Sequence, residues 1–207
     1  MKKFRIKTVS KSLLADVITP VSIYLKVRDI YPNSILLESS DYHGNENSFS
    51  FICLKPVATF KADNGKYAVT YPDGSTIKGE LDSFERRFTD FIQCFQPQDA
   101  NGKIPVNGLF GYTCYDAVKY FEKISLQAPV KDEYKIPDIQ YSFYKLIIAI
   151  NHFQNILYII ENQFDNEISE SEKIESLLSS KNFATYPFKP EGSEHSNITD
   201  DDNIKML

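Results

Sequence analysis

The chain has 207 residues, a formal net charge of −5 and a 42% share of hydrophobic residues, enough for one large domain or two small ones with a substantial core. No apolar run approaches the roughly 18–20 residues that span a bilayer, and the basic start is too interrupted by polar residues to be a signal peptide. Cys53, Cys94 and Cys114 are odd in number and widely spaced, which fits a reducing compartment. We therefore expect a soluble, cytoplasmic protein without membrane association.

The negative charge is concentrated toward the end of the chain. From Glu161 onward there are 11 acidic and 4 basic residues, a balance of −7, whereas the preceding residues are nearly neutral. Neither part contains a basic stripe with interleaved aromatic residues, the pattern that nucleic-acid surfaces require. These features argue against nucleic-acid binding.

The first elements are a short helix and strands. Thr19 and Pro20 match an N-cap followed by proline at the first helical position, and predict a helix to about Lys26. Residues 34–38 and 48–54 are rich in Ile, Leu and Phe and predict two strands. Pro56 is expected to interrupt the second strand before the apolar pattern resumes at 57–61.

Two turn signals then predict a meander of antiparallel strands. Asp63-Asn64-Gly65 precedes a returning strand at 67–71, and Pro72-Asp73-Gly74 precedes another at 76–79. We expect each strand to pair with the one before it.

A helix is predicted from Asp82 to Phe95, with Asp82 as the cap and with phenylalanines at helical spacing that pack on the sheet. The polar stretch 96–107 reads as a loop. The segment GLFGY, residues 108–112, is expected to introduce a second helix at about 113–123.

Apolar strands at 141–151 and 156–161 form a predicted hairpin, and the serine- and glutamate-rich segment after residue 168 predicts a surface helix. Several short antiparallel strands with helices set apart indicate an α+β fold with antiparallel sheets and packed helices.

The composition changes near the end of the chain. We expect one domain over residues 1–185, a linker over 186–198, and a further element that starts at 199 and reaches only to 207. Thr199 followed by three aspartates is typical of a helix start. This arrangement suggests the front part of a longer protein.

The chain contains no recognisable catalytic or metal-binding motif. It has no GxSxG elbow, phosphate-binding loop, CxxC pair or calcium loop, and His43, His152 and His195 lie in expected loops, where a solvated side chain is the simplest interpretation. We therefore assign no catalytic residue and no metal ligand.

The most informative segment is Ser34–Ser39 with the strand that follows it. An apolar run ends in Glu38 and Ser39, and Phe49 and Ser50 begin the next strand. A carboxylate and a hydroxyl at the lip of an apolar wall can hold the ammonium and another polar group of a small ligand. The alternative is an ordinary strand end that faces water.

Five segments in order resemble anthranilate synthase component I, a chorismate-utilising enzyme of tryptophan biosynthesis, in its N-terminal part. They are DVITPVSIYL, SILLESSD, SFSFICLKP, GLFGYTCYD and SNITDDDNIKML. Three positions depart from the family pattern: Ser48 replaces an arginine, Cys53 replaces a glycine, and a basic residue falls at Lys119. The resemblance implies the fold of that N-terminal domain.

The resemblance also implies a regulatory site. Leu37, Glu38, Ser39, Phe49 and Ser50 correspond to residues that line the family's site for tryptophan, the feedback inhibitor. The chorismate site, the catalytic groups and the Mg²⁺ ligands belong to a second domain in the family. This chain alone is thus expected to be inactive, to hold no metal or cofactor, and to bind tryptophan weakly or not at all.

The implied partner is a glutamine amidotransferase subunit that supplies ammonia. Gly108, Gly111, Tyr112, Tyr115 and Asp116 are candidate contacts with it or with the second domain. Two alternatives stay open: the N-terminal domain of aminodeoxychorismate synthase component I, of the folate pathway, and a stand-alone amino-acid-binding regulator.

Overall fold

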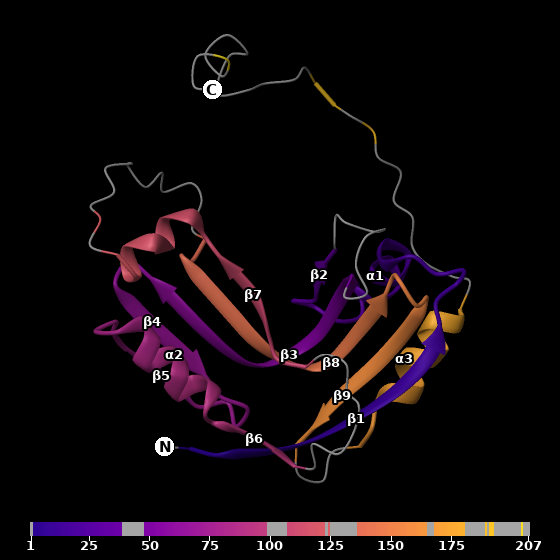
Figure 1. The fold of residues 1–207 in the computed structure, drawn as a ribbon, viewed down its shortest axis with the longest axis horizontal. Coiled ribbons are helices and arrows are strands. Elements are labelled where there is room, and N and C mark those ends of the chain that lie inside the picture. The colour runs from indigo at the N-terminus through magenta and orange to yellow at the C-terminus, as the bar shows by residue number, and fades with distance from the viewer. Residues whose placement is uncertain are drawn as a thin grey trace.

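The computed structural model describes residues 2–38, 48–98, 107–122, 124, 136–164, 168–180, 189, 191–192 and 204 (Figure 1). Its strands are β1 (Phe4–Leu14), β2 (Ile35–Leu37), β3 (Phe49–Asp63), β4 (Lys66–Thr70), β5 (Thr76–Glu80), β6 (Phe95–Gln98), β7 (Leu109–Thr113), β8 (Ile139–Asn151) and β9 (Ile156–Gln163). Its helices are α1 (Pro20–Val27), α2 (Phe84–Ile92), α3 (Ser171–Ser179) and the 3₁₀ helix η1 (Tyr115–Tyr120). None of the described helices is long and apolar enough to cross a membrane.

The nine strands among the described residues belong to one sheet, in the order β5-β4-β3-β8-β9-β1-β6, with β2 beside β3 and β7 beside β8. Each neighbouring pair is antiparallel except β1 and β6, which are parallel. This large, mostly antiparallel sheet with few helices confirms the predicted α+β class.

The long strands β3 and β8 pair along almost their whole length and run through both halves of the sheet. One half adds β2 to β3 and β9 to β8, and the other adds β4 to β3 and β7 to β8. In Figure 1 the halves meet at an angle, with α2 on one half and with α1 and α3 on the other.

The sheet changes direction at Lys55 and Pro56. Lys55 has a positive φ of 55°, and the register with β8 shifts between Pro56 and Ala58. Proline is tolerated at such a bulge because it has no N–H to contribute to the ladder. The interruption expected at Pro56 is therefore a bulge inside one strand, and residues 49–54 and 57–61 both belong to β3.

Three clusters of buried side chains form the core. One lies beneath α1 and α3, with Ile23, Val27, Ile174 and Leu178 among its members, and a second includes Phe60 and Phe91 beneath α2. The third contains only strand residues among those described: Cys53, Phe110, Tyr144, Ile147, Ala149 and Ile160. We call the surface of this third cluster the helix-free wall.

The first helix is confirmed, and its cap is complete. The Thr19 hydroxyl accepts a hydrogen bond from the Ser22 backbone N–H at 3.1 Å, and the Ser22 hydroxyl accepts one from the Thr19 N–H at 3.1 Å. Pro20 occupies the first turn, where its missing N–H costs nothing. The predicted turns at 63–65 and 72–74 are also confirmed, because they join β3 to β4 and β4 to β5.

The second helix is shorter than predicted. Its N-cap is Ser83 rather than Asp82, and it ends at Ile92. The Asp82 carboxylate instead pairs with Arg86 and Arg87. Phe95 lies in β6, an unpredicted strand, and stacks on Phe143 with ring centroids 4.6 Å apart.

The GLFGY segment was wrongly predicted to introduce a helix. It forms β7, and only the short 3₁₀ helix η1 follows it. Gly111 explains the strand: a Cβ there would lie 1.9 Å from the Gln140 carbonyl oxygen, so only glycine allows β7 to approach β8 this closely.

The predicted hairpin of β8 and β9 and the predicted helix α3 are confirmed. The expected linker and the element from residue 199 fall almost entirely outside the described residues. The three-part division at 185 and 198 therefore stays a prediction.

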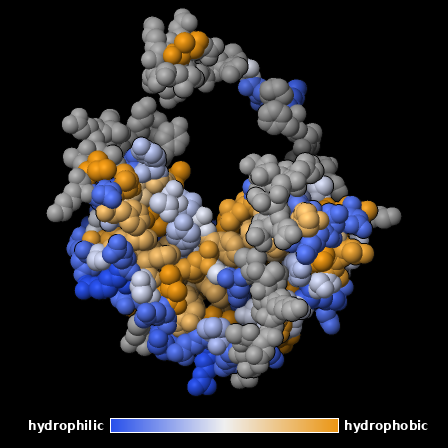
Figure 2. Space-filling view, in the orientation of Figure 1, coloured by the Kyte–Doolittle hydropathy of each residue, from blue (hydrophilic) through white to orange (hydrophobic). Residues whose placement is uncertain are grey.

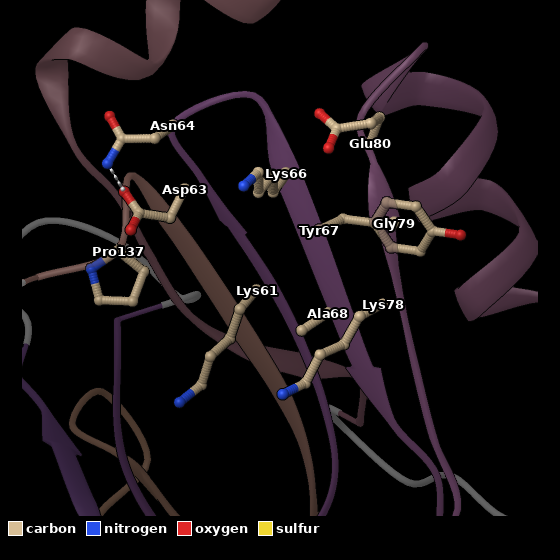
Figure 3. A pocket seen from close by; sticks show the side chains of 10 residues that line it. All are labelled: Lys61, Asp63, Asn64, Lys66, Tyr67, Ala68, Lys78, Gly79, Glu80 and Pro137. Atoms are coloured by element: carbon tan, nitrogen blue, oxygen red, sulfur yellow. Dashed lines mark hydrogen bonds between the residues drawn. The ribbon is translucent and has the colours of Figure 1, made fainter.

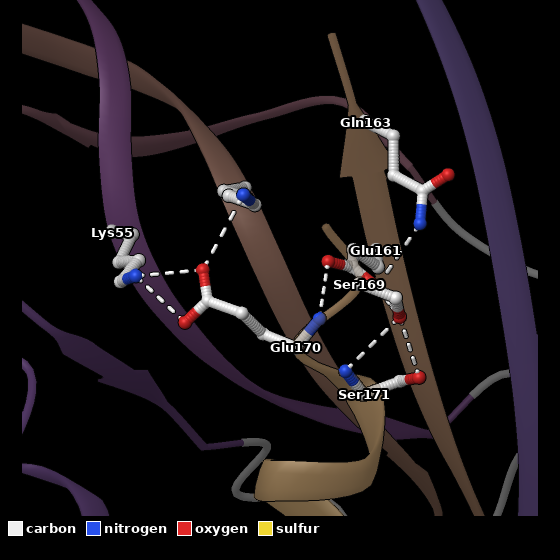
Figure 4. A network of polar contacts seen from close by, with 7 residues as sticks. Lys55, Glu161, Gln163, Ser169, Glu170 and Ser171 are labelled. Carbon is white, nitrogen blue, oxygen red and sulfur yellow. Dashed lines mark hydrogen bonds and ion pairs between the residues drawn. The ribbon is translucent and has the colours of Figure 1, made fainter. Parts of the chain in front are cut away.

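A polar network joins the bend of the sheet to the start of α3 (Figure 4). The Glu170 carboxylate accepts hydrogen bonds from Lys55 at 2.7 Å and forms an ion pair with Lys145 at 3.3 Å. The Glu161 carboxylate is fully buried and accepts hydrogen bonds from the Ser169 hydroxyl and from the Glu170 backbone N–H. Glu170 is the N-cap residue of α3, and the helix dipole favours a negative charge at this end of a helix.

This network predicts acid sensitivity that depends on Glu170. Burial raises the pKa of this carboxyl, but the bonds from Lys55 and Lys145 outweigh burial and lower the pKa below its ordinary 4.5. The charged form thus stabilises the fold above about pH 4.5, and this contribution disappears as the pH falls through the lowered pKa.

We expect the difference in unfolding free energy between the wild type and Glu170→Gln to shrink steadily between pH 6 and pH 3, as measured by urea denaturation. Glu172→Gln, on the exposed surface of the same helix, is the matched control and should show no such trend. An equally large and pH-independent loss in Glu170→Gln would contradict the electrostatic explanation.

Gly111→Ala should destabilise the protein by about 1–3 kcal/mol, because the new methyl group must push β7 away from β8. Gly108→Ala provides the control, since a Cβ there meets nothing within 4 Å, and it should change stability by less than about 0.5 kcal/mol. Equal stability of the two variants in urea titrations would show that the close approach costs nothing.

Candidate binding site

The predicted site residues lie where β2 ends and β3 begins. Leu37 is the cross-strand partner of Phe51, and Ile35 is the partner of Cys53. Because side chains alternate along a strand, Leu37, Phe49 and Phe51 point to the same face of the sheet. All three pack against the third core cluster and extend the helix-free wall.

The wall is largely aromatic. Phe49 stacks on Phe51 at 5.9 Å between ring centroids, Phe51 lies 5.2 Å from Phe110, and Phe110 lies 6.5 Å from Tyr144. Phe49 and Phe51 are half-buried. In Figure 2, hydrophobic residues gather in the hollow between the two halves of the sheet.

Ser50 lies on the opposite face from Leu37 and Phe49. It is fully buried, and its Oγ lies 2.7 Å from Nε2 of His152. His152 follows β8 directly, and its backbone N–H donates to the Ser48 carbonyl oxygen at 3.0 Å. The structure thus separates Ser50 from the apolar wall and pairs it with a histidine.

His152 is half-buried, not a fully solvated loop residue as expected. Burial lowers the pKa of its imidazole, and the Glu38 carboxylate acts in the opposite direction and raises it. The Glu38 charge is therefore close enough to His152 to act on it, although the Glu38 residue itself is exposed. A polar corner of Glu38, Ser50 and His152 borders the wall.

On the sequence alone, His152 was expected in a loop and was not assigned to the site. The signal that could have found it is its position: it comes directly after Asn151, which pairs with Phe49 at the start of β3. The remaining predicted member of the site, Ser39, lies outside the described residues.

Comparisons with known proteins give a consistent result. No protein-family model matches the chain. Anthranilate synthase component 1 of Thermus thermophilus is 28% identical over 170 residues, which is 81% of this chain and 34% of that protein. The Lactococcus lactis protein of the same name is 30% identical over 165 residues, 78% of this chain and 34% of its own. The chain is thus similar in sequence to anthranilate synthase component 1 over about four-fifths of its length.

The chain spans about a third of the length of these anthranilate synthase relatives. A crystal structure of anthranilate synthase component I from Streptococcus pneumoniae aligns with a TM-score of 0.44 and 23% identity, over 80% of this chain and 34% of that one. The resemblance inferred from the five sequence segments is thus confirmed by curated relatives.

The residues predicted to contact a second domain or the partner lie on β7 and η1. Tyr112, Tyr115 and Asp116 are exposed, and Tyr115 is 91% accessible. Gly108 precedes β7, and Gly111 lies within it against β8. These residues form one continuous segment of surface, and their role as contacts stays a prediction.

A magnesium site is not evident in the described part of the chain. Among those residues there is no group of three or more His, Cys, Asp or Glu side chains that could hold a metal ion. The location of the Mg²⁺ ligands in a second domain, which the family resemblance implies, stays a prediction.

The polar corner yields a direct test. We expect the pKa of His152, measured by NMR titration, to lie below 6.5 and to fall further in Glu38→Gln, because the carboxylate that favours the charged imidazole is removed. Glu85→Gln, which changes an exposed carboxylate on α2, should leave the pKa of His152 unchanged. An unaltered pKa in Glu38→Gln would place Glu38 away from His152.

Proposed function

We propose that this chain is the tryptophan-binding, regulatory part of an anthranilate synthase component I. The observation that carries the proposal is the similarity to curated anthranilate synthases over about four-fifths of the chain. In this proposal the whole enzyme converts chorismate and ammonia to anthranilate and pyruvate in the cytoplasm. Its Mg²⁺ and catalytic groups lie in the part that this chain does not match, and a glutamine amidotransferase subunit supplies the ammonia.

The helix-free wall suits the indole ring of tryptophan. Phe49 and Phe51 present half-buried rings beside Leu37, and aromatic groups stack favourably on such rings, with a gain of about 0.5–1.5 kcal/mol beyond area burial. A hollow lined by apolar and aromatic side chains with a few polar groups at its border is typical of small-ligand sites.

The polar border of the helix-free wall suits the ammonium group of tryptophan. Glu38 follows Leu37 at the end of β2, and its charge acts on His152, so its carboxylate lies at the rim of the wall on the side of Ser50 and His152. An ion pair at an exposed position contributes only about 0–1 kcal/mol, so Glu38 provides orientation and selectivity more than affinity. Ser50, which faces away from the wall, supports this corner through His152 rather than by contact with the ligand.

Feedback inhibition requires tryptophan to prefer one arrangement of the enzyme over another, with a coupling free energy of about 1–3 kcal/mol. A site on one open wall cannot provide this preference alone. We therefore infer that the second domain completes the pocket, and that the isolated chain binds tryptophan only weakly.

An NMR titration of the chain with L-tryptophan tests the proposal. We expect saturable shifts at Leu37, Phe49 and Phe51 with a millimolar dissociation constant, which corresponds to about −4 kcal/mol. Glu38→Gln should weaken binding up to fivefold, because one exposed ion pair is lost. Glu85→Gln is the matched control and should bind as the wild type does.

The results of this titration distinguish a partial tryptophan site from a complete one and from no site at all. L-Alanine, which lacks the indole, should cause no saturable shifts at the wall. Micromolar affinity for tryptophan would mean that the chain holds a complete site, as a stand-alone regulator would. Absence of shifts at the wall with millimolar tryptophan would overturn the assignment of the site.

A further inference from the structure

The half of the sheet that carries α2 has an opposite face with a distinct polar pattern. On that side β3, β4 and β5 align their residues in three cross-strand rows. By their register, these rows are Asp63–Lys66–Glu80, Lys61–Ala68–Lys78 and Thr59–Thr70–Thr76. The reverse face carries Phe60, Tyr67 and Val69 in the core beneath α2, which holds these strands in place.

The middle row leaves a gap between two lysines. Neighbouring strands are about 4.8 Å apart, so the backbones of Lys61 and Lys78 are separated by about 10 Å, with only the methyl group of Ala68 between them. These residues line a pocket on this face of the sheet. Figure 3 shows the side chains of Lys61 and Lys78 extending to the same end of that pocket, near Ala68.

The pocket has a volume of about 690 Å³, within the usual range for small-ligand sites. Its charged groups are divided between its two ends. Lys66 lies between Asp63 and Glu80 in its own row, so this row has no unmatched cation and carries a net charge of −1. Lys61 and Lys78 have neutral row neighbours, Gln140 and Ala68, and neither forms an ion pair with any residue that the structure describes.

Two uncompensated cations that face one gap repel each other, and an anion between them removes this cost. A ligand with two anionic groups can meet both lysines at once, whereas a single carboxylate meets one.

We propose that Lys61 and Lys78 form a binding site for a small dicarboxylate, whose two carboxylates contact the two ammonium groups above Ala68. The site lies on the half of the sheet away from Leu37 and Glu38, so it does not depend on the proposed tryptophan site.

A titration of the ¹⁵N-labelled chain with succinate at low salt tests this site. Amide shifts should be saturable and centred on Lys61, Ala68 and Lys78, with a dissociation constant in the millimolar range. Acetate, which carries one carboxylate, should bind about threefold to fivefold more weakly, the factor expected from one exposed ion pair. Added NaCl should weaken the binding of succinate, because the pair is exposed and therefore screened.

Two double variants that each remove two positive charges distinguish a specific binding site from general electrostatic attraction between the protein and the anion. Lys61→Gln with Lys78→Gln should abolish the saturable shifts. Lys7→Gln with Lys173→Gln removes two other exposed lysines, one on β1 and one on α3, both outside the pocket, and should keep the dissociation constant within twofold. The spectra of both variants also report whether the fold is retained.

Three results would overturn the proposal. Equal weakening in both double variants would mean that only the overall charge matters. Equal binding of acetate and succinate would show that the two lysines do not act together. Shifts centred away from the middle row would place the anion elsewhere.

Discussion

The continuous pairing of β3 with β8 is the constraint on which the rest of the structure depends. These two strands run through both halves of the sheet, and every other strand attaches directly or indirectly to one of them. Because the bend at Lys55 and Pro56 lies in β3, it fixes the angle between the helix-free wall and the lysine-bearing face. The Glu170 carboxylate, which binds Lys55 and Lys145, secures that bend to α3.

The two faces of the sheet differ in how they are covered. On one side, α1, α2 and α3 cover apolar side chains and supply most of the burial that stabilises the fold. On the other side the described residues include no covering helix, and the sheet presents an aromatic wall at one half and polar rows at the other. The proposed ligand contacts all lie on this side of the sheet, which no described helix covers.

Local signals in the sequence predicted much of this fold. The cap of α1, the two turns between β3 and β5, and the β8–β9 hairpin depend on neighbouring residues, and all were correct. The strand β1 was missed because residues such as Lys7, Ser10 and Ser12 give it no apolar pattern; its place comes from backbone pairing with β9 and β6. The strand β7 was mistaken for a helix start because the need for Gly111 arises only when β8 lies against it. In the candidate site, Leu37 and Phe49 were placed on one wall, but the pairing of Ser50 with His152 joins residues about a hundred positions apart that no local pattern links.

The outermost strands of the open sheet carry their own protection against self-association. The edge strand β6 has only four residues and contains Pro97, which cannot donate to a further strand, and β5 at the other edge carries Lys78 and Glu80. Short edges with proline and charged side chains discourage another chain from continuing the ladder. A sheet with no described helix on one face can thus remain exposed there without polymerising through its ends.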